Sequence, residues 1–279
     1  MSNFIKFGDN DPNVVIDTWN KMISEVVSSY FLPPEKRKVC VDIGSNIGAF
    51  MGHALAQEKF EEVYGFEPAF QTYHTSLAML KNFKLLREKV QVRNLAVTEK
   101  TGQILRLFSE ESEESGNTTL IQPDKIDQEE LCITVSLDDI FGILNVDYID
   151  YLKMDCEGAE FNILYGCERI QDIGVICMEI HEGASKGARD KIENLLRNFG
   201  FWTLSFYITE TKEDSDILVA INTQREDITK FRDYYGFRPG GIKTTILDLE
   251  KEKVDQGGSK LNIEEYTEWF AEELRKREK

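Results

Sequence analysis

The sequence has few basic residues for its length. Its 279 residues include 33 lysines and arginines against 50 aspartates and glutamates, which gives a formal net charge of −17. A field of that sign repels a phosphate backbone, which proteins usually bind with clustered lysine and arginine. We therefore expect that nucleic acid is not a partner.

Cysteines at C-x-x-C spacing are also absent. The five cysteines are Cys40, Cys132, Cys156, Cys167 and Cys177, and several of them lie in apolar runs that are typical of buried strands. We expect reduced thiols in the core of the protein.

Long apolar runs are absent as well. No run approaches the roughly 18 residues that a membrane-spanning helix requires. Residues 1–10 lack the basic region and the long apolar stretch of a signal peptide. The expectation is a soluble cytoplasmic protein with no membrane span.

Strands alternate with helices between residues 39 and 221, an order that is typical of a mostly parallel sheet. Apolar runs predict seven strands, at 39–43, 63–66, 90–95, 148–154, 175–180, 201–206 and 217–221. Helical spacing predicts helices at 47–57, 70–81, 159–169 and 186–198. The expected fold is a Rossmann-like α/β domain with helices on both faces of the sheet.

Two further segments flank this domain, which we place at 39–224. An N-terminal extension, 1–38, carries an amphipathic pattern at 14–30, and an accessory segment, 225–279, ends in a predicted helix at 262–279. The apolar stripe of that last helix predicts packing on the core first and homo-oligomer formation second. Within the domain, the acidic stretch 110–119 resembles a mobile loop over a site.

The predicted first strand runs into a glycine-bearing turn and then a helix, with Gly44, Asn46 and Gly48 in a G-x-N-x-G spacing. Glycines let the backbone approach a ligand, and the N–H groups at a helix start attract an anionic group such as a carboxylate. The turn therefore predicts a ligand site. A plain glycine-rich turn with Asn46 as a helix cap remains the alternative.

An acidic residue, Glu67, ends the second strand 23 residues after Gly44. A carboxylate at that position can accept hydrogen bonds from both hydroxyls of a ribose. Asp42, beside the turn, suits a ligand that carries ammonium and sulfonium charge better than one that carries phosphates. This combination favours S-adenosylmethionine over NAD.

Polar pairs follow the fourth and fifth strands. Asp155 and Glu157 alternate after one, and Glu179 and His181 after the other, so each pair is expected at the carboxyl edge of the sheet. His181, as a neutral imidazole, and Glu157 are our candidate bases. Simple capping roles are the alternatives: His181 at a strand end, and Glu157 at the helix that follows, with Glu160 compensating the helix dipole.

The same four side chains are donors that also suit Mg²⁺. We expect no metal at this edge. If one binds, Asp155, Glu157, Glu179 and His181 are its predicted ligands.

These segments together resemble the FkbM family of methyltransferases, in a VDIGSNIG turn, a GFEP segment, a KMDCEGAE strand end and a MEIHEG strand end. The resemblance implies a class I methyltransferase fold that uses S-adenosylmethionine, generally for O-methylation of sugars and other small molecules. By that likeness Glu67 would hold the ribose, and Asp155 and Glu157 would face the methyl group. It also implies methionine-side contacts from Asp42, Gly44, Ser45, Asn46 and Gly48, and adenine-side contacts from Asn94 or Ala96.

Other functions fit the sequence less well. An NAD-linked oxidoreductase or epimerase of the short-chain type would need a tyrosine followed four residues later by lysine, and amino-group methyltransferases would show a D-P-P-Y-like turn; neither pattern occurs. The D-x-D at 214–216, which would suit a glycosyltransferase, fits a solvated turn. A non-catalytic module that keeps the cofactor pocket stays open as an alternative.

Overall fold

The structure is a computed structural model that describes residues 30–82, 89–109, 118–119, 128–181, 187–207 and 216–235. The predicted terminal helix at 262–279, nearly all of the predicted helix at 14–30 and most of the acidic stretch 110–119 lie outside these residues. The expectation of self-association through the last helix is therefore still a prediction.

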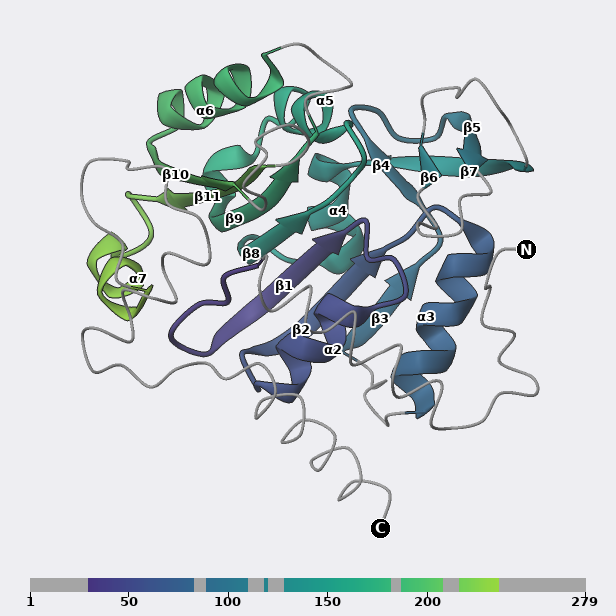
Figure 1. Ribbon diagram of the computed structural model, residues 1–279, viewed down its shortest axis with the longest axis horizontal. Coiled ribbons are helices and arrows are strands. Elements are labelled where there is room, and N and C mark those ends of the chain that lie inside the picture. Colours follow the sequence, from purple (N-terminus) through teal and green to yellow (C-terminus); the bar gives the residue numbers. More distant parts are fainter. Residues whose placement is uncertain are drawn as a thin grey trace.

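A seven-stranded sheet forms the centre of the molecule (Figure 1). It consists of β1 (Arg37–Ile43), β2 (Phe60–Phe66), β3 (Val90–Arg93), β8 (Ile149–Met154), β9 (Ile173–Ile180), β10 (Phe201–Tyr207) and β11 (Asp216–Asn222). Each of these strands coincides with one of the seven that the apolar runs predicted, so the α/β class is confirmed.

The strand order is β10-β11-β9-β8-β1-β2-β3. The five strands from β9 to β3 are parallel, while β11 runs antiparallel to both of its neighbours. From β1 the chain first builds outward through β2 and β3 and then crosses to β8 on the other side. The carboxyl ends of β1 and β8 therefore mark the point where open α/β sheets bind ligands.

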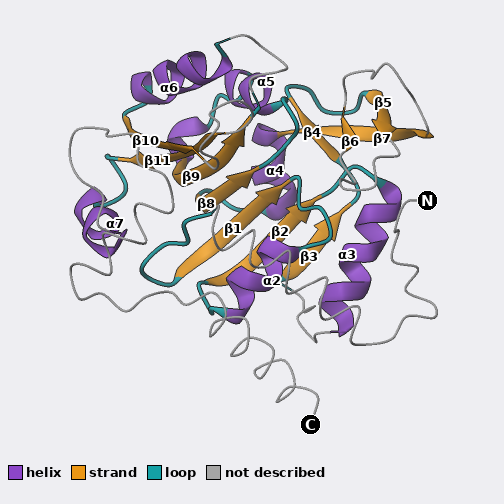
Figure 2. Ribbon diagram, viewed as in Figure 1, coloured by secondary structure: helices purple, strands orange, loops and turns teal. Residues whose placement is uncertain are grey.

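Helices cover both faces of the sheet, as expected (Figure 2). Val39, Val41 and Ile43 of β1 point to the face covered by α4 (Leu137–Leu144), α5 (Glu160–Tyr165) and α6 (Ala188–Asn198). Cys40, between them, points to the face covered by α2 (Ala49–Ala56), α3 (Phe70–Asn82) and α7 (Ile228–Tyr235). Successive strand residues face opposite sides, so the continuous apolar run of β1 fills two cores at once.

Helix α7 follows the boundary that we placed after residue 224. Its Phe231 is buried in the same core as α2 and α3. The boundary itself is still a prediction.

A second, four-stranded sheet lies between β3 and β8 in the chain, in a stretch for which the sequence predicted no strand. Its order is β4-β7-β5-β6, from β4 (Ala96–Thr98), β5 (Ile104–Ser109), β6 (Thr118–Thr119) and β7 (Gln128–Ser136). The third predicted strand, 90–95, is also shorter than expected: it ends at Arg93, and only two residues separate it from β4. A 3-10 turn, η1 (Ile170–Asp172), precedes β9.

The expected reduced thiols and the length of the helices can be compared with the structure. All five cysteines are free thiols, and all but Cys156 are buried. In the described part of the chain, no helix has both the length and the apolar character that crossing a membrane would require.

Gly44 allows the ends of β1 and β8 to approach each other. It has a φ of +72°, and a Cβ there would overlap the backbone oxygen of Asp155. Gly102 has a similar φ of +78° but open space around it. Gly102→Ala should therefore lose only about 1 to 2 kcal/mol of unfolding free energy, the cost of the backbone conformation, whereas Gly44→Ala should lose at least about 2 kcal/mol more. Urea unfolding of both variants tests this, and equal losses would contradict the close approach.

Candidate active site

The glycine turn between β1 and α2 is held against β2. The N–H groups of Gly44 and Ser45 both donate to the carbonyl oxygen of Phe66, at 3.0 and 3.1 Å. Gly48, with a φ of +81°, starts α2. Ser45 and Gly48 thus shape the turn but do not line the cleft beside it. Gly44 and Asn46 do line that cleft.

Glu67 is placed at this turn as predicted. One of its oxygens accepts the Asn46 N–H and the other accepts the Ala69 N–H, each at 2.9 Å. Burial raises the pKa of Glu67 to about 7, although these two N–H groups and the charge of Lys153 favour its ionised form. The carboxyl is therefore held rigidly at the cleft and lies close to its titration midpoint at neutral pH.

One cleft is lined by Glu67 and by the carboxylates of Asp155 and Glu157. Near Glu67 its walls are apolar, with Phe66, Ala96, Val97 and Leu107 among them. Ala96 thus lines the cleft, and its contact with adenine stays a prediction.

Asn94 does not line this cleft. Its side-chain amide donates to the carbonyl oxygens of Glu67 and Pro68, at 3.0 and 2.7 Å. This amide therefore fastens the segment that carries Glu67, and an adenine-side contact from Asn94 or Ala96 stays a prediction.

Asp42 also has a different role from the expected one. It is fully buried outside the cleft, and its Oδ1 lies 3.2 Å from Nζ of Lys153, its neighbour in the register of β1 and β8. The same ammonium donates to the Gly44 carbonyl at 2.8 Å and lies 3.7 Å from Asp155 Oδ2. Burial alone would lower the pKa of Lys153, but Asp42 and Asp155 outweigh it and raise it. The charge of Asp42 is therefore offset within the protein and is not presented to a ligand.

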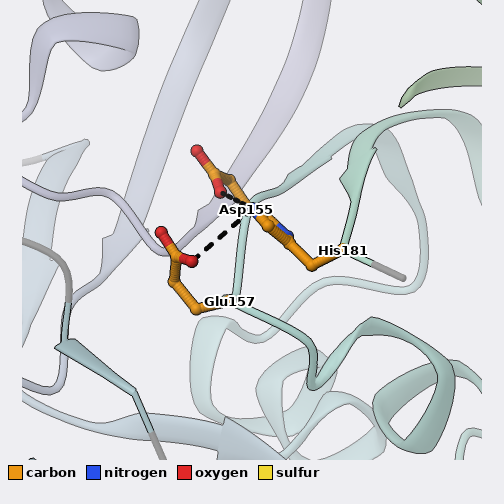
Figure 3. A group of neighbouring side chains, drawn as sticks. All are labelled: Asp155, Glu157 and His181. Atoms are coloured by element: carbon orange, nitrogen blue, oxygen red, sulfur yellow. Dashed lines mark ion pairs between the residues drawn. The ribbon is translucent and has the colours of Figure 1, made fainter. Parts of the chain in front are cut away.

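The four polar residues predicted at the carboxyl edge do converge. Nε2 of His181 lies 3.6 Å from Glu157 Oε2, 3.8 Å from Glu179 Oε1 and 4.0 Å from Asp155 Oδ1. Figure 3 shows the side chains of Asp155 and Glu157 turned toward the imidazole. Two strand ends that are consecutive in the sheet thus form one acidic cluster around a histidine.

The charge state of His181 differs from the prediction. Burial alone lowers its pKa, but a hydrogen bond to Glu160 and the charges of Glu160, Glu157 and Asp155 raise it to about 9. We predicted a neutral imidazole ready to take a proton. In these surroundings the ring carries a positive charge near neutral pH, so His181 does not suit the role of general base.

Sequence reasoning missed two contacts of this cluster. The buried Tyr30 hydroxyl donates to Asp155 Oδ2 at 3.0 Å and lies 3.5 Å from Glu179 Oε2. The buried Glu160 carboxylate lies 3.1 Å from His181 Nδ1. Tyr30 is the last residue of the amphipathic pattern at 14–30, and no local pattern connects it with residues more than a hundred positions away.

Comparison with known proteins agrees with this geometry. A family profile described as the methyltransferase FkbM domain matches residues 42–202, which is more than half of the chain and contains both the turn and the acidic cluster. The chain belongs to the FkbM methyltransferase family. Its mostly parallel seven-stranded sheet fits the class I methyltransferase fold that the resemblance implied.

Individual relatives are distant from this FkbM domain. It is 26% identical over 209 residues to the AMB antimetabolite synthetase AmbE of Pseudomonas aeruginosa, covering 61% of this chain and 10% of that protein. The chain thus spans about a tenth of the length of the curated relative that it matches.

Two solved structures are distantly similar to this chain. The methyltransferase FkbM of Methylobacillus flagellatus shares 16% identity, with a TM-score of 0.49, over 74% of this chain and 52% of that one. TrmK of M. capricolum, solved with S-adenosyl-homocysteine, shares 10%, with a TM-score of 0.44, over 93% and 94%.

The buried ammonium of this FkbM domain gives a stability prediction. Lys153→Met should lower the unfolding free energy by about 3 to 5 kcal/mol, because it leaves the Asp42 carboxylate unpaired in the core. The exposed Lys38 of the same strand pair provides the control, since Lys38→Met removes an equal charge from the surface of β1. Adding Asp42→Asn to Lys153→Met should restore part of the loss in urea unfolding. A Lys153→Met variant as stable as Lys38→Met would contradict the ion pair.

Proposed function

We propose that this chain transfers a methyl group from S-adenosylmethionine to a hydroxyl oxygen of a sugar or another small molecule. The observation that carries the proposal is the continuous cleft between Glu67, suited to a ribose, and the Asp155 and Glu157 carboxylates. A nucleoside held at one end would direct its sulfonium methyl group toward the other. Membership of the FkbM family supports methyl transfer as the reaction.

The charge of the cleft supports this cofactor. In the proposed complex, the apolar walls at Phe66, Val97 and Leu107 accommodate the adenine, and Glu67 accepts hydrogen bonds from the ribose. Asp155 and Glu157 favour the positive charge of the sulfonium and ammonium groups. The pyrophosphate of NAD would meet the same carboxylates and be repelled.

The proposed reaction is an in-line displacement at the methyl carbon. The acceptor oxygen forms the new O–C bond while the C–S bond breaks with its electron pair on sulfur, which leaves a neutral thioether. The hydroxyl proton passes to a carboxylate, and we propose Glu157 for this step. Burial raises the pKa of Glu157, against the opposing effect of His181, and this makes it a better base than an exposed glutamate.

Several observations support a small acceptor in the cytoplasm. The net charge of −17 is unfavourable for nucleic acid. The distant relative AmbE is described as an antimetabolite synthetase, which fits a small-molecule acceptor. The five free thiols fit a reducing compartment.

Binding and turnover measurements test the proposed function. Calorimetry should find saturable binding of S-adenosylmethionine and S-adenosylhomocysteine, and none of NAD. With a panel of sugar and polyol acceptors and isotope-labelled methyl donor, Glu157→Gln should still bind the cofactor, although more weakly because one attracting charge is lost. At saturating cofactor it should lose at least about 100-fold in transfer rate, a typical loss for a missing general base. Glu61→Gln, an exposed carboxylate at the amino end of β2, is the matched control. Binding of NAD alone would refute the proposal, and cofactor binding without transfer to any acceptor would favour the non-catalytic module.

The raised pKa of Glu67 gives a pH prediction. Ribose hydroxyls donate to the ionised carboxylate, so below its pKa of about 7 the ligand must displace a proton. Affinity for S-adenosylhomocysteine should therefore rise with pH from 5.5 to 7, by up to about tenfold per unit, and then level off. Glu67→Gln should bind more weakly and lose this slope in calorimetric titrations. An equal slope in wild type and variant would assign the titration to another group.

A further inference from the structure

The atoms around His181 Nε2 are arranged as ligands of a common centre. Oxygens of Asp155, Glu157 and Glu179 lie 3.6 to 4.0 Å from this nitrogen, beyond hydrogen-bond distance. One donor atom each from Asp155, Glu157 and His181 lies within 4.8 Å of the other two. Ligands of one metal ion, each about 2.0 to 2.3 Å from it, are separated by distances of this order.

Glu160 fixes the orientation of the imidazole from behind. Its Oε1 lies 3.1 Å from His181 Nδ1 and also accepts the backbone N–H groups of Cys156 and Gly158, at 2.9 and 3.2 Å. Since these N–H groups can only donate, the oxygen is an acceptor, and Nδ1 carries the hydrogen. The other ring nitrogen is then turned to the carboxylates. A carboxylate behind a histidine is the usual second layer of a metal site.

Tyr30 orients two of the carboxylates from the side. Its hydroxyl approaches Oδ2 of Asp155 and Oε2 of Glu179, so the remaining oxygens, Oδ1 and Oε1, face His181. The ammonium of Lys153 is likewise on the Oδ2 side of Asp155. The Lys153 charge therefore lies on the far side of Asp155, while other oxygens of the carboxylates gather around Nε2 of the His181 ring.

We propose that Asp155, Glu157 and His181 bind a divalent first-row transition metal ion, for which Mn²⁺ is the probe, with Glu179 beside it. Carboxylate oxygens suit Mn²⁺, and an imidazole ligand favours transition metals over Mg²⁺ and Ca²⁺. Asp155 and Glu157 line the cleft, so the open coordination positions face the acceptor. Asp155 and Glu157 contribute Oδ1 and Oε2, which leaves Glu157 Oε1 to take a proton.

The ion would act on the acceptor in the proposed reaction. A hydroxyl oxygen bound to a divalent cation has a lowered pKa and gives up its proton more readily as the O–C bond forms. Only this role rests on the proposed function. Binding of the ion is a separate property of the cluster and is measured without any substrate.

Titration of the purified, chelator-treated chain with Mn²⁺ tests the site. The electron paramagnetic resonance signal of free Mn²⁺ should fall as one ion binds per chain. His181→Ala and Asp155→Asn should each weaken binding at least tenfold, and Glu160→Gln, which changes only the group behind the histidine, by roughly 10 to 100-fold. Glu61→Gln removes a carboxylate from the opposite edge of the sheet and should leave binding unchanged.

Two outcomes would overturn the proposal: no saturable Mn²⁺ binding, or binding that Asp155→Asn, His181→Ala and Glu160→Gln leave unchanged. Circular dichroism identifies any variant that fails to fold. If Asp155→Asn or His181→Ala fails to fold, the Mn²⁺ affinity of Glu160→Gln, which preserves size and most hydrogen bonds, tests the site. S-adenosylmethionine binding and methyl transfer without Mn²⁺ binding would refute the metal site alone. Mn²⁺ binding without cofactor binding would refute only the methyltransferase proposal.

Discussion

The ammonium of Lys153 lies where β1 and β8 end, and the rest of the site depends on its position. It contacts Asp42 on its own face of the sheet, the Gly44 carbonyl at the start of the turn and Asp155 at the start of the acidic cluster. A lysine is rarely this deeply buried unless it is paired. Here one charge offsets part of the burial of Asp42, whose pKa is still raised, and the same ammonium also contacts the turn and the acidic cluster.

The two ends of the cleft differ in electrostatic character for a structural reason. At one end, Glu67 lies among apolar walls, and burial raises its pKa to about 7. At the other end, carboxylates from β9 and from the segment after β8 crowd around His181, whose pKa rises to about 9. Burial of a single carboxyl favours its protonated form and raises its pKa. A group of carboxylates instead favours the positively charged form of a residue among them.

Local pattern was sufficient to predict the large sheet but not the small one. The runs at β1, β2, β8, β9 and β11 are buried on both faces over most of their length, and such strands read as continuous runs. In β5 and β7, Ile104, Leu131 and Ile133 lie on the outer face and are 57 to 70% exposed. Apolar residues on both faces blur the alternation of a half-buried strand, so no strand was predicted in this segment.

For the candidate site, the sequence placed residues at the right edge but did not reveal their partners. Glu67, Asp155, Glu157, Glu179 and His181 all lie where strand ends predicted them. The pairing of Lys153 with Asp42 depends on the register of two strands more than a hundred residues apart, and the contacts of Tyr30 cross a similar separation. Asn94 and Asp42 were assigned to the ligand because polar side chains beside a turn suit both roles. Only the three-dimensional contacts show that each is already used inside the protein.

The turn after β8 shows how the backbone directs these side chains. Glu157 and Gly158 both have positive φ values, 51° and 100°. A left-handed glutamate costs of order 1 to 3 kcal/mol and persists only where the surroundings hold it. Glu160 stabilises this conformation. Its buried carboxylate accepts hydrogen bonds from the N–H groups on either side of Glu157, and it also contacts His181. The group that stabilises the strained turn is thus the one that orients the histidine, so Glu157 cannot relax to an ordinary conformation without disturbing His181.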